Sequence, residues 1–154
     1  MGTDPTMPNK LTDHFTVDEF TASQTAARMG IPNVPDGDEL ANVRRTAEVM
    51  ERVRTILGNR PILISSGYRG PEVNRAVGGS ATSAHMTGLA VDFTCPGFGT
   101  PVEICHALSP HMADLGIDQL IHEFDSWVHL GLSTAAPRMM ALTINSAGTR
   151  NGIA

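Results

Sequence analysis

Three side chains that can bind a metal ion, His85, Asp92 and His129, occur in two short segments of this 154-residue chain. His85 and Asp92 are seven residues apart in S-A-H-M-T-G-L-A-V-D-F, and His129 lies in S-W-V-H-L-G-L. Two neutral imidazoles and one carboxylate leave a tetrahedral zinc ion with one open position for water, which is typical of hydrolytic rather than closed structural sites. The residue types therefore predict a catalytic site with one Zn²⁺ per chain.

Asp92 is the ligand that an ordinary hydrophobic core explains least well. It stands in the apolar run L-A-V-D-F, and buried carboxylates are rare unless they are paired or bound to a metal. Gly88 lies between His85 and Asp92, and its conformational freedom lets a loop residue and a strand residue face one ion. Both features favour metal binding over a packing role.

Four segments of the chain resemble the zinc DD-peptidase-like metallopeptidases. This family shares its fold with D-Ala-D-Ala carboxypeptidases, phage peptidoglycan endopeptidases and the hedgehog signalling domain. In order and spacing the segments are most similar to a small subgroup often encoded by phages, and the resemblance covers residues 11–144. It implies that His85, Asp92 and His129 hold the zinc. The segments are S-S-G-Y-R at 65–69, V-N-R-A-V-G-G at 73–79, S-A-H-M-T-G-L-A-V-D at 83–92 and D-Q-L-I-H-E-F-D-S-W-V-H at 118–129.

The same resemblance implies that Glu123 is the general base. In peptidases of this fold a carboxylate beside the zinc takes the proton of the attacking water and later delivers it to the leaving amine. Hedgehog-like members place this Glu six residues before the last His ligand, as Glu123 precedes His129. Other members use an acid three residues before the last His ligand. This chain has Ser126 at that position and Asp125 four residues before His129, so Asp125 remains an alternative base. A two-residue hairpin would put Glu123 and His129 on opposite faces, so Glu123 requires a bulge or a longer loop.

Five further residues are candidates for the site. Arg69 resembles the family's arginine that meets a substrate carbonyl or carboxylate, because a guanidinium donates two parallel hydrogen bonds; the alternative is a structural salt bridge. Ser83 is expected to hydrogen-bond the substrate or the ligand loop, and Tyr68 to do the same or simply to pack. His122 is a candidate to support the ligands or the transition state. Trp127 either packs beneath the hairpin or forms a wall of the substrate cleft.

Periodicity and capping signals predict an α+β fold, with an antiparallel sheet and helices packed around it. The expected division is an irregular arm at 1–10, one zinc peptidase domain at 11–146 and a loose tail at 147–154. Helices are predicted over 16–29, 38–57, 71–77 and 100–109, and strands over 61–65, 89–94, 119–124, 127–132 and 139–144.

The composition argues against several kinds of partner. A net charge of −5 and a single lysine, Lys10, argue against nucleic-acid binding and against a polybasic membrane anchor. No apolar stretch approaches the ~18 residues that span a bilayer, and the first residues lack the features of a signal peptide. We therefore expect synthesis in the cytoplasm, followed by action on the cell wall after release or from a virion. Cys95 and Cys105 are expected to be reduced, buried thiols.

The resemblance as a whole implies a zinc metallopeptidase, either a carboxypeptidase or an endopeptidase, that hydrolyses amide bonds in peptidoglycan stem peptides or cross-links. Two alternatives belong to other classes of protein. One is a structural component of a virion, and the other is a hedgehog-like binding module that zinc stabilises. Retention of the ligands, Glu123 and Arg69 together argues against the binding module, because a purely structural zinc site has no need of a base.

Overall fold

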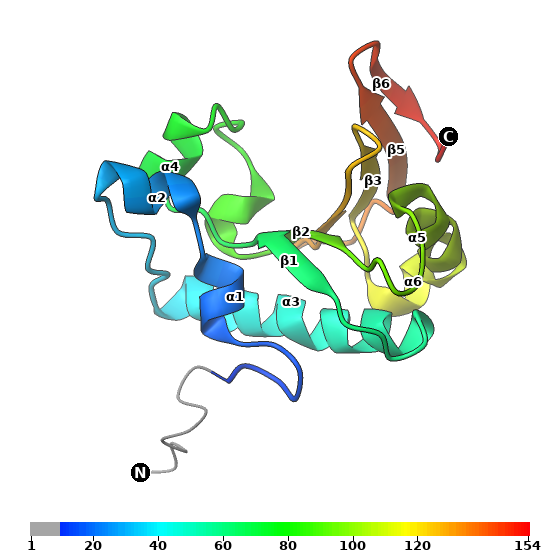
Figure 1. Ribbon diagram of the computed structural model, residues 1–154, viewed down its shortest axis with the longest axis horizontal. Coiled ribbons are helices and arrows are strands. Elements are labelled where there is room, and N and C mark those ends of the chain that lie inside the picture. The colour runs from blue at the N-terminus through cyan, green and yellow to red at the C-terminus, as the bar shows by residue number, and fades with distance from the viewer. Residues whose placement is uncertain (1–9) are drawn as a thin grey trace.

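A single six-stranded sheet, with strand order β1-β2-β4-β3-β5-β6, forms the centre of the computed structural model, which describes residues 10–154 (Figure 1). Neighbouring strands are antiparallel except β3 and β5, which are parallel, because the chain crosses from the end of β4 to the far side of β3 before β5 begins. The expected α+β class is confirmed. The strands are β1 (Leu63–Ser66), β2 (Ala90–Thr94), β3 (Gln119–Glu123), β4 (Trp127–Gly131), β5 (Met140–Asn145) and β6 (Gly148–Asn151).

The helices follow the capping signals with one exception. The single helix expected over 16–29 is wrong: it is interrupted at Ala22, whose backbone is extended, and Ser23 then caps a new helix by accepting a hydrogen bond from the Ala26 amide. None of the helices within residues 10–154 combines the length and the apolar character needed to cross a membrane. The α-helices are α1 (Val17–Thr21), α2 (Gln24–Met29), α3 (Gly37–Ile56), α4 (Pro71–Ala76), α5 (Pro101–Leu108) and α6 (Met112–Leu115), and the 3₁₀ turns are η1 (Ala84–Thr87) and η2 (Ser109–His111).

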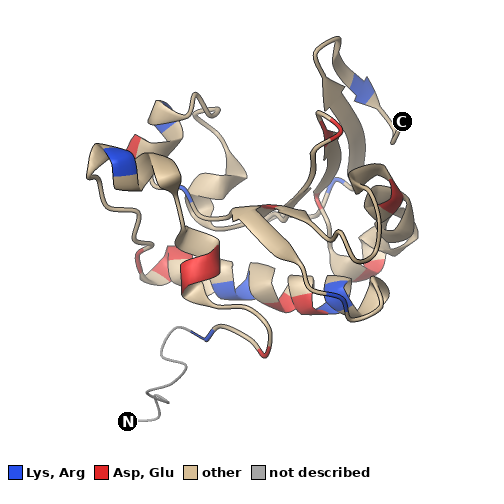
Figure 2. Ribbon diagram, viewed as in Figure 1, with Lys and Arg blue, Asp and Glu red and all other residues tan. Residues whose placement is uncertain are grey.

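Helix α3 provides one side of the hydrophobic core. Its buried residues Val43, Ala47, Met50 and Val53 recur every three or four positions and so share one face, while acidic and basic residues are interspersed along its length (Figure 2). In β2, Val91 and Phe93 join the same core cluster. Because side chains alternate along a strand, Asp92 between them faces the other side of the sheet. That other face carries the polar side chains described below.

Both cysteines lie in this core. Cys95 and Cys105 are buried and unbridged, and burial raises the pKa of the Cys105 thiol to about 12. Such a thiol stays protonated and unreactive at neutral pH. The prediction of reduced, buried thiols is therefore confirmed.

The two ends of the chain were expected to be irregular. Residues 1–9 of the expected arm lie outside the described residues, and Lys10 makes an isolated bridge to Thr16. The prediction of a loose tail at 147–154 is wrong, because β6 pairs with β5 and the Ala154 amide donates a hydrogen bond to Thr143 Oγ1 at 2.9 Å. The sequence did not predict β6, because all four of its residues are exposed and no alternation of apolar and polar residues marks the strand.

Candidate metal centre and active site

A turn at Gly88 joins the elements that present His85 and Asp92. Gly88 has φ +83°, and a Cβ at this position would lie 2.7 Å from the Glu39 carbonyl oxygen on α3. At the other end of η1, Ser83 Oγ accepts a hydrogen bond from the His85 amide at 3.2 Å. The turn is thus held close against α3, and it places His85 beside the strand that carries Asp92.

Strand register brings the third residue to the other two. Asp92 on β2 is paired directly with His129 on β4, and paired residues of antiparallel strands share a face. Asp92 Oδ1 lies 2.9 Å from His129 Nδ1 and 3.3 Å from His85 Nε2. One ligand atom from each residue lies within 4.8 Å of the other two. The three residues selected from the sequence form one cluster.

The protonation of this cluster suits a zinc ion. His85 Nδ1 lies 2.7 Å from the Gly67 carbonyl oxygen, and a carbonyl can only accept, so Nδ1 carries the proton and Nε2 is free to coordinate. Burial alone raises the pKa of Asp92, but contacts with His129 and His85 outweigh it and hold this pKa well below its usual range. Zinc bonds of about 2.0 to 2.1 Å place tetrahedral ligands about 3.3 Å apart, close to the distances found here.

The cluster opens into a cavity of about 620 Å³. His85, Asp92 and His129 form part of its wall, so a water molecule and a substrate can reach the space beside the residues that would hold the metal. Other residues chosen from the sequence share this wall, namely Arg69, Ser83, Glu123 and Trp127.

The β3–β4 hairpin has the longer loop that Glu123 requires. Three residues, 124–126, join the strands, and Phe124 and Asp125 both adopt positive φ. Glu123 pairs with Trp127 and Ile121 pairs with His129, so Glu123 and His129 lie on the same face. Glu123 Oε1 is 3.9 Å from His129 Nδ1, and burial raises the pKa of this carboxyl group. A carboxylate of raised pKa beside the cluster is suited to accept a proton.

The alternative base lies on the other side of the hairpin. Asp125 Oδ1 contacts His122 Nε2 at 3.1 Å, and His122 Nδ1 donates to the Ala154 carbonyl oxygen at 2.9 Å. His122 neighbours Glu123 on β3 and therefore faces the opposite side of the sheet. Neither His122 nor Asp125 lines the metal cavity. The structure thus does not bring His122 to the ligands, and its expected supporting role has no geometric basis.

Arg69 reaches the cavity from the loop after β1. Its Nη2 donates to Ser83 Oγ at 3.2 Å, and its backbone amide donates to the His85 carbonyl at 3.0 Å. Burial lowers the pKa of the guanidinium, while Asp92 and Glu123 raise it; the group stays charged at neutral pH. Within residues 10–154 no carboxylate lies within 4.0 Å of Arg69. A structural salt bridge therefore does not account for its position.

A family model described as Peptidase M15 matches residues 13–131, which include the three ligands, Glu123 and Arg69. The chain belongs to the peptidase M15 family. M15 peptidases depend on zinc, and the cluster of His85, Asp92 and His129 can bind one ion. The protein is accordingly a zinc metallopeptidase. A comparison with curated proteins found no match.

Two aromatic candidates have different positions in this M15 peptidase. Tyr68 is buried, and its hydroxyl donates to Glu39 Oε1 on α3 at 2.9 Å; burial and this bond raise the pKa of the phenol to about 12. Tyr68 does not line the metal cavity, so the expectation that it contacts substrate is not supported and it acts as a packing residue. Trp127 does line the cavity, with its ring centroid 5.7 Å from that of Phe124.

The metal cavity of the M15 peptidase also contains an ion pair that the sequence reasoning missed. Asp118 is buried and accepts hydrogen bonds from Arg138 Nη2 at 2.7 Å and Arg138 Nε at 3.1 Å, and both residues line the cavity. Asp118 is the first residue of the segment D-Q-L-I-H-E. An acidic residue directly before a buried strand is the one feature of the sequence that could have indicated its place in the cavity. Arg138 lies in a segment without a recognisable motif and could be found only in three dimensions.

Arg69→Lys should lower kcat/KM for peptide hydrolysis while zinc content and melting temperature stay normal. Lysine keeps the charge but loses the planar pair of donors, which corresponds to a loss on the order of 1 to 3 kcal/mol of transition-state stabilisation. Arg75→Lys on the exposed side of α4 is the matched control. A lower melting temperature with unchanged turnover per folded molecule would show that Arg69 is a structural residue.

Proposed function

We propose that this M15 peptidase hydrolyses amide bonds in peptidoglycan stem peptides or cross-links, as part of cell-wall lysis or remodelling related to phages. The observation that carries the proposal is the shared cavity, in which the three ligands, Glu123 and Arg69 meet. The choice of substrate rests on the resemblance of segments 65–69, 73–79, 83–92 and 118–129 to the zinc DD-peptidase-like family, and most of all to its small subgroup often encoded by phages. The protein would act on the wall after release, or as part of a virion.

The residues of the cavity can divide the steps of amide hydrolysis among them. A zinc ion held by His85, Asp92 and His129 would supply Lewis acidity, which polarises a carbonyl and lowers the pKa of water. Glu123 takes a proton from the attacking water, and a new C–O bond forms at the scissile carbon. As the C–N bond breaks, Glu123 returns the proton to the amine nitrogen. Arg69 donates hydrogen bonds to a carbonyl or carboxylate of the substrate and so fixes its position.

The geometry also favours an enzyme over a binding module that zinc only stabilises. A binding module that uses zinc only for stability requires the ligands but not a partly desolvated carboxylate beside them. The raised pKa of Glu123 and its place in the same open cavity support a role in proton transfer. A role as a virion component is compatible with this chemistry, and it predicts stoichiometric recovery of the protein with purified particles.

The proposal is tested by incubating the zinc-loaded protein with defined peptidoglycan fragments and analysing the products by mass spectrometry. One fragment is a stem pentapeptide with a free D-Ala-D-Ala end, and the other is a cross-linked dimer of stem peptides. Loss of one terminal alanine identifies a carboxypeptidase, and division of the dimer or of the stem identifies an endopeptidase. If a fully zinc-loaded, folded protein leaves every fragment intact, peptidoglycan is not its substrate. A chelator-treated sample is the control.

A further inference from the structure

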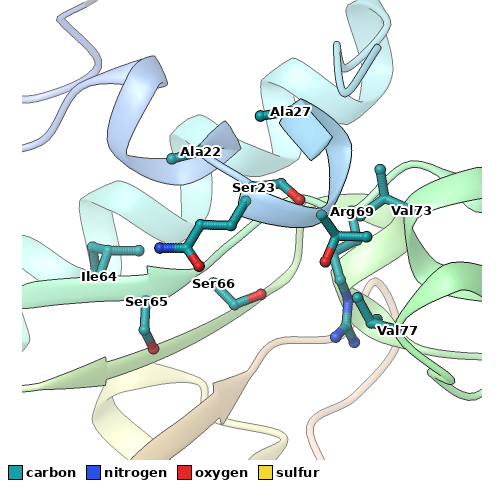
Figure 3. Close-up of a pocket in the computed structure, with 11 residues that line it drawn as sticks. Ala22, Ser23, Ala27, Ile64, Ser65, Ser66, Arg69, Val73 and Val77 are labelled. Atoms are coloured by element: carbon teal, nitrogen blue, oxygen red, sulfur yellow. The ribbon is translucent and has the colours of Figure 1, made fainter. Parts of the chain in front are cut away.

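A second cavity of about 700 Å³ lies between α2, β1 and α4 (Figure 3). We call it the β1 groove and define it by the positions that line it, 22–25, 27, 64–66, 69, 73 and 77. Arg69 lines both cavities. The two cavities therefore adjoin at Arg69, so a ligand longer than the metal cavity has the groove as the neighbouring space.

The lining of the β1 groove differs in charge from that of the metal cavity. Besides Arg69 its described lining consists of uncharged polar side chains, such as Ser23, Gln24 and Ser66, and apolar ones, such as Ile64 and Val77 (Figure 3). Away from Arg69, a charged group placed here would lose water without gaining a partner of opposite charge. Peptide amides can bond to the hydroxyl and amide groups, while short side chains contact the apolar ones. The lining therefore suits an uncharged stretch of peptide.

Strand β1 gives the groove a backbone edge. It is an outer strand of the sheet, and β2 is its strand neighbour. The outer side of such a strand presents N–H and C=O groups that an extended peptide can pair with. The edge ends just before Tyr68, whose amide donates to the Phe20 carbonyl oxygen on α1 at 2.6 Å.

The same strand leads to the metal ligands. Ser66 at the end of β1 is paired with Asp92 on β2, and Ser65 Oγ donates to the Asp92 carbonyl oxygen at 3.2 Å. A peptide extended along β1 toward Arg69 would thus arrive beside the residue that coordinates the metal. The shared residue Arg69 and the pairing of Ser66 with Asp92 favour an occupant that is part of the same substrate.

We propose that the β1 groove binds an uncharged, extended segment of the peptide substrate, on one side of the bond that is cleaved. This inference rests on the proposed peptidase function and adds a binding site to it. Charged groups of the substrate would lie in the metal cavity, where Arg69, Arg138 and Glu123 are found. The groove would then select for neutral residues with short side chains at the positions it contacts.

Binding can be tested without hydrolysis. The probe is N-acetylated, C-amidated tetra-alanine, titrated at millimolar concentration into zinc-loaded, ¹⁵N-labelled Glu123→Gln protein. The largest amide shift changes are expected in 22–27, 64–66 and 73–77. Val77 lies at the end of α4 and is 44% exposed in the parent, so Val77→Trp in the same background should fill the groove. This substitution should weaken binding by about tenfold or more, a change of about 1.4 kcal/mol.

The matched control is Ala76→Trp, because Ala76 is the exposed neighbour of Val77 and does not line the groove. It should bind the probe as the parent does. Absence of shift changes, shift changes confined to other regions, or equal weakening by both tryptophans would overturn the inference.

A kinetic experiment separates this inference from the proposed function. In the parent enzyme, Val77→Trp should lower kcat/KM for long peptidoglycan fragments by about tenfold relative to the shortest fragment cleaved, and Ala76→Trp should not. Equal losses of kcat/KM on long and short fragments would contradict the proposal that the groove binds substrate. If the wild-type protein cleaves no fragment, the proposed function fails, and the titration still decides whether the groove binds peptide.

Discussion

Glu123→Gln should reduce hydrolysis by roughly 10²- to 10⁴-fold while the protein keeps its fold and its zinc. The amide has nearly the size of the carboxylate and retains hydrogen bonding, but it cannot accept the proton of the attacking water. Glu123 is not one of the three clustered ligands, and its Oε1 lies 3.9 Å from His129 Nδ1. Product formation from peptidoglycan fragments, zinc content and melting temperature measure the three parts of this prediction.

The matched control for the base is Asp125→Asn. Asp125 stands two residues from Glu123, but it contacts His122 on the opposite side of the sheet. Removing its charge should leave hydrolysis within a few-fold of wild type, because no step of the reaction passes through it. A greater loss in Asp125→Asn than in Glu123→Gln would show that the base has been assigned to the wrong carboxylate.

His129→Ala should abolish hydrolysis and remove most of the zinc. It also leaves Asp92 without its 2.9 Å contact in a largely buried position, and a lost ligand lowers metal affinity severely. A ligand at 100 times its Kd stabilises the native state by about 2.7 kcal/mol, so loss of zinc corresponds to a fall in melting temperature on the order of 5 to 10 °C. Metal analysis and thermal unfolding with and without added zinc provide the measurements.

His122→Ala is the comparison for His129→Ala, because both imidazoles are buried on adjacent strands and only His129 faces the cavity. His122→Ala loses its bonds to Asp125 and to the Ala154 carbonyl and can lower stability, but it should bind one zinc per chain. The metal assignment fails if His85→Ala and His129→Ala both retain full occupancy. Equal zinc loss in His122→Ala would show that the effect comes from general destabilisation.

The sequence by itself determined the metal-binding residues and most of the elements that carry them. Two imidazoles and a carboxylate placed in an apolar run are a local chemical signal, and the family segments gave them an order. The capping boxes at Thr16 and Thr100 are likewise local, since each depends on residues three positions apart. Such features are read from neighbours in the chain, so they are predictable without a fold.

Only the tertiary structure decided which side chains share a face. The three-residue loop after Glu123 sets the register of β3 against β4, and one residue of difference would have turned Glu123 away and His122 toward the metal. Tyr68 packs against α3 although it precedes Arg69 directly, and β6 forms without an apolar pattern because β5 supplies its hydrogen-bonding partner. The ion pair of Asp118 with Arg138 and the β1 groove have the same origin: each depends on segments distant in sequence, whose meeting is fixed by strand pairing and core packing rather than by any local signal.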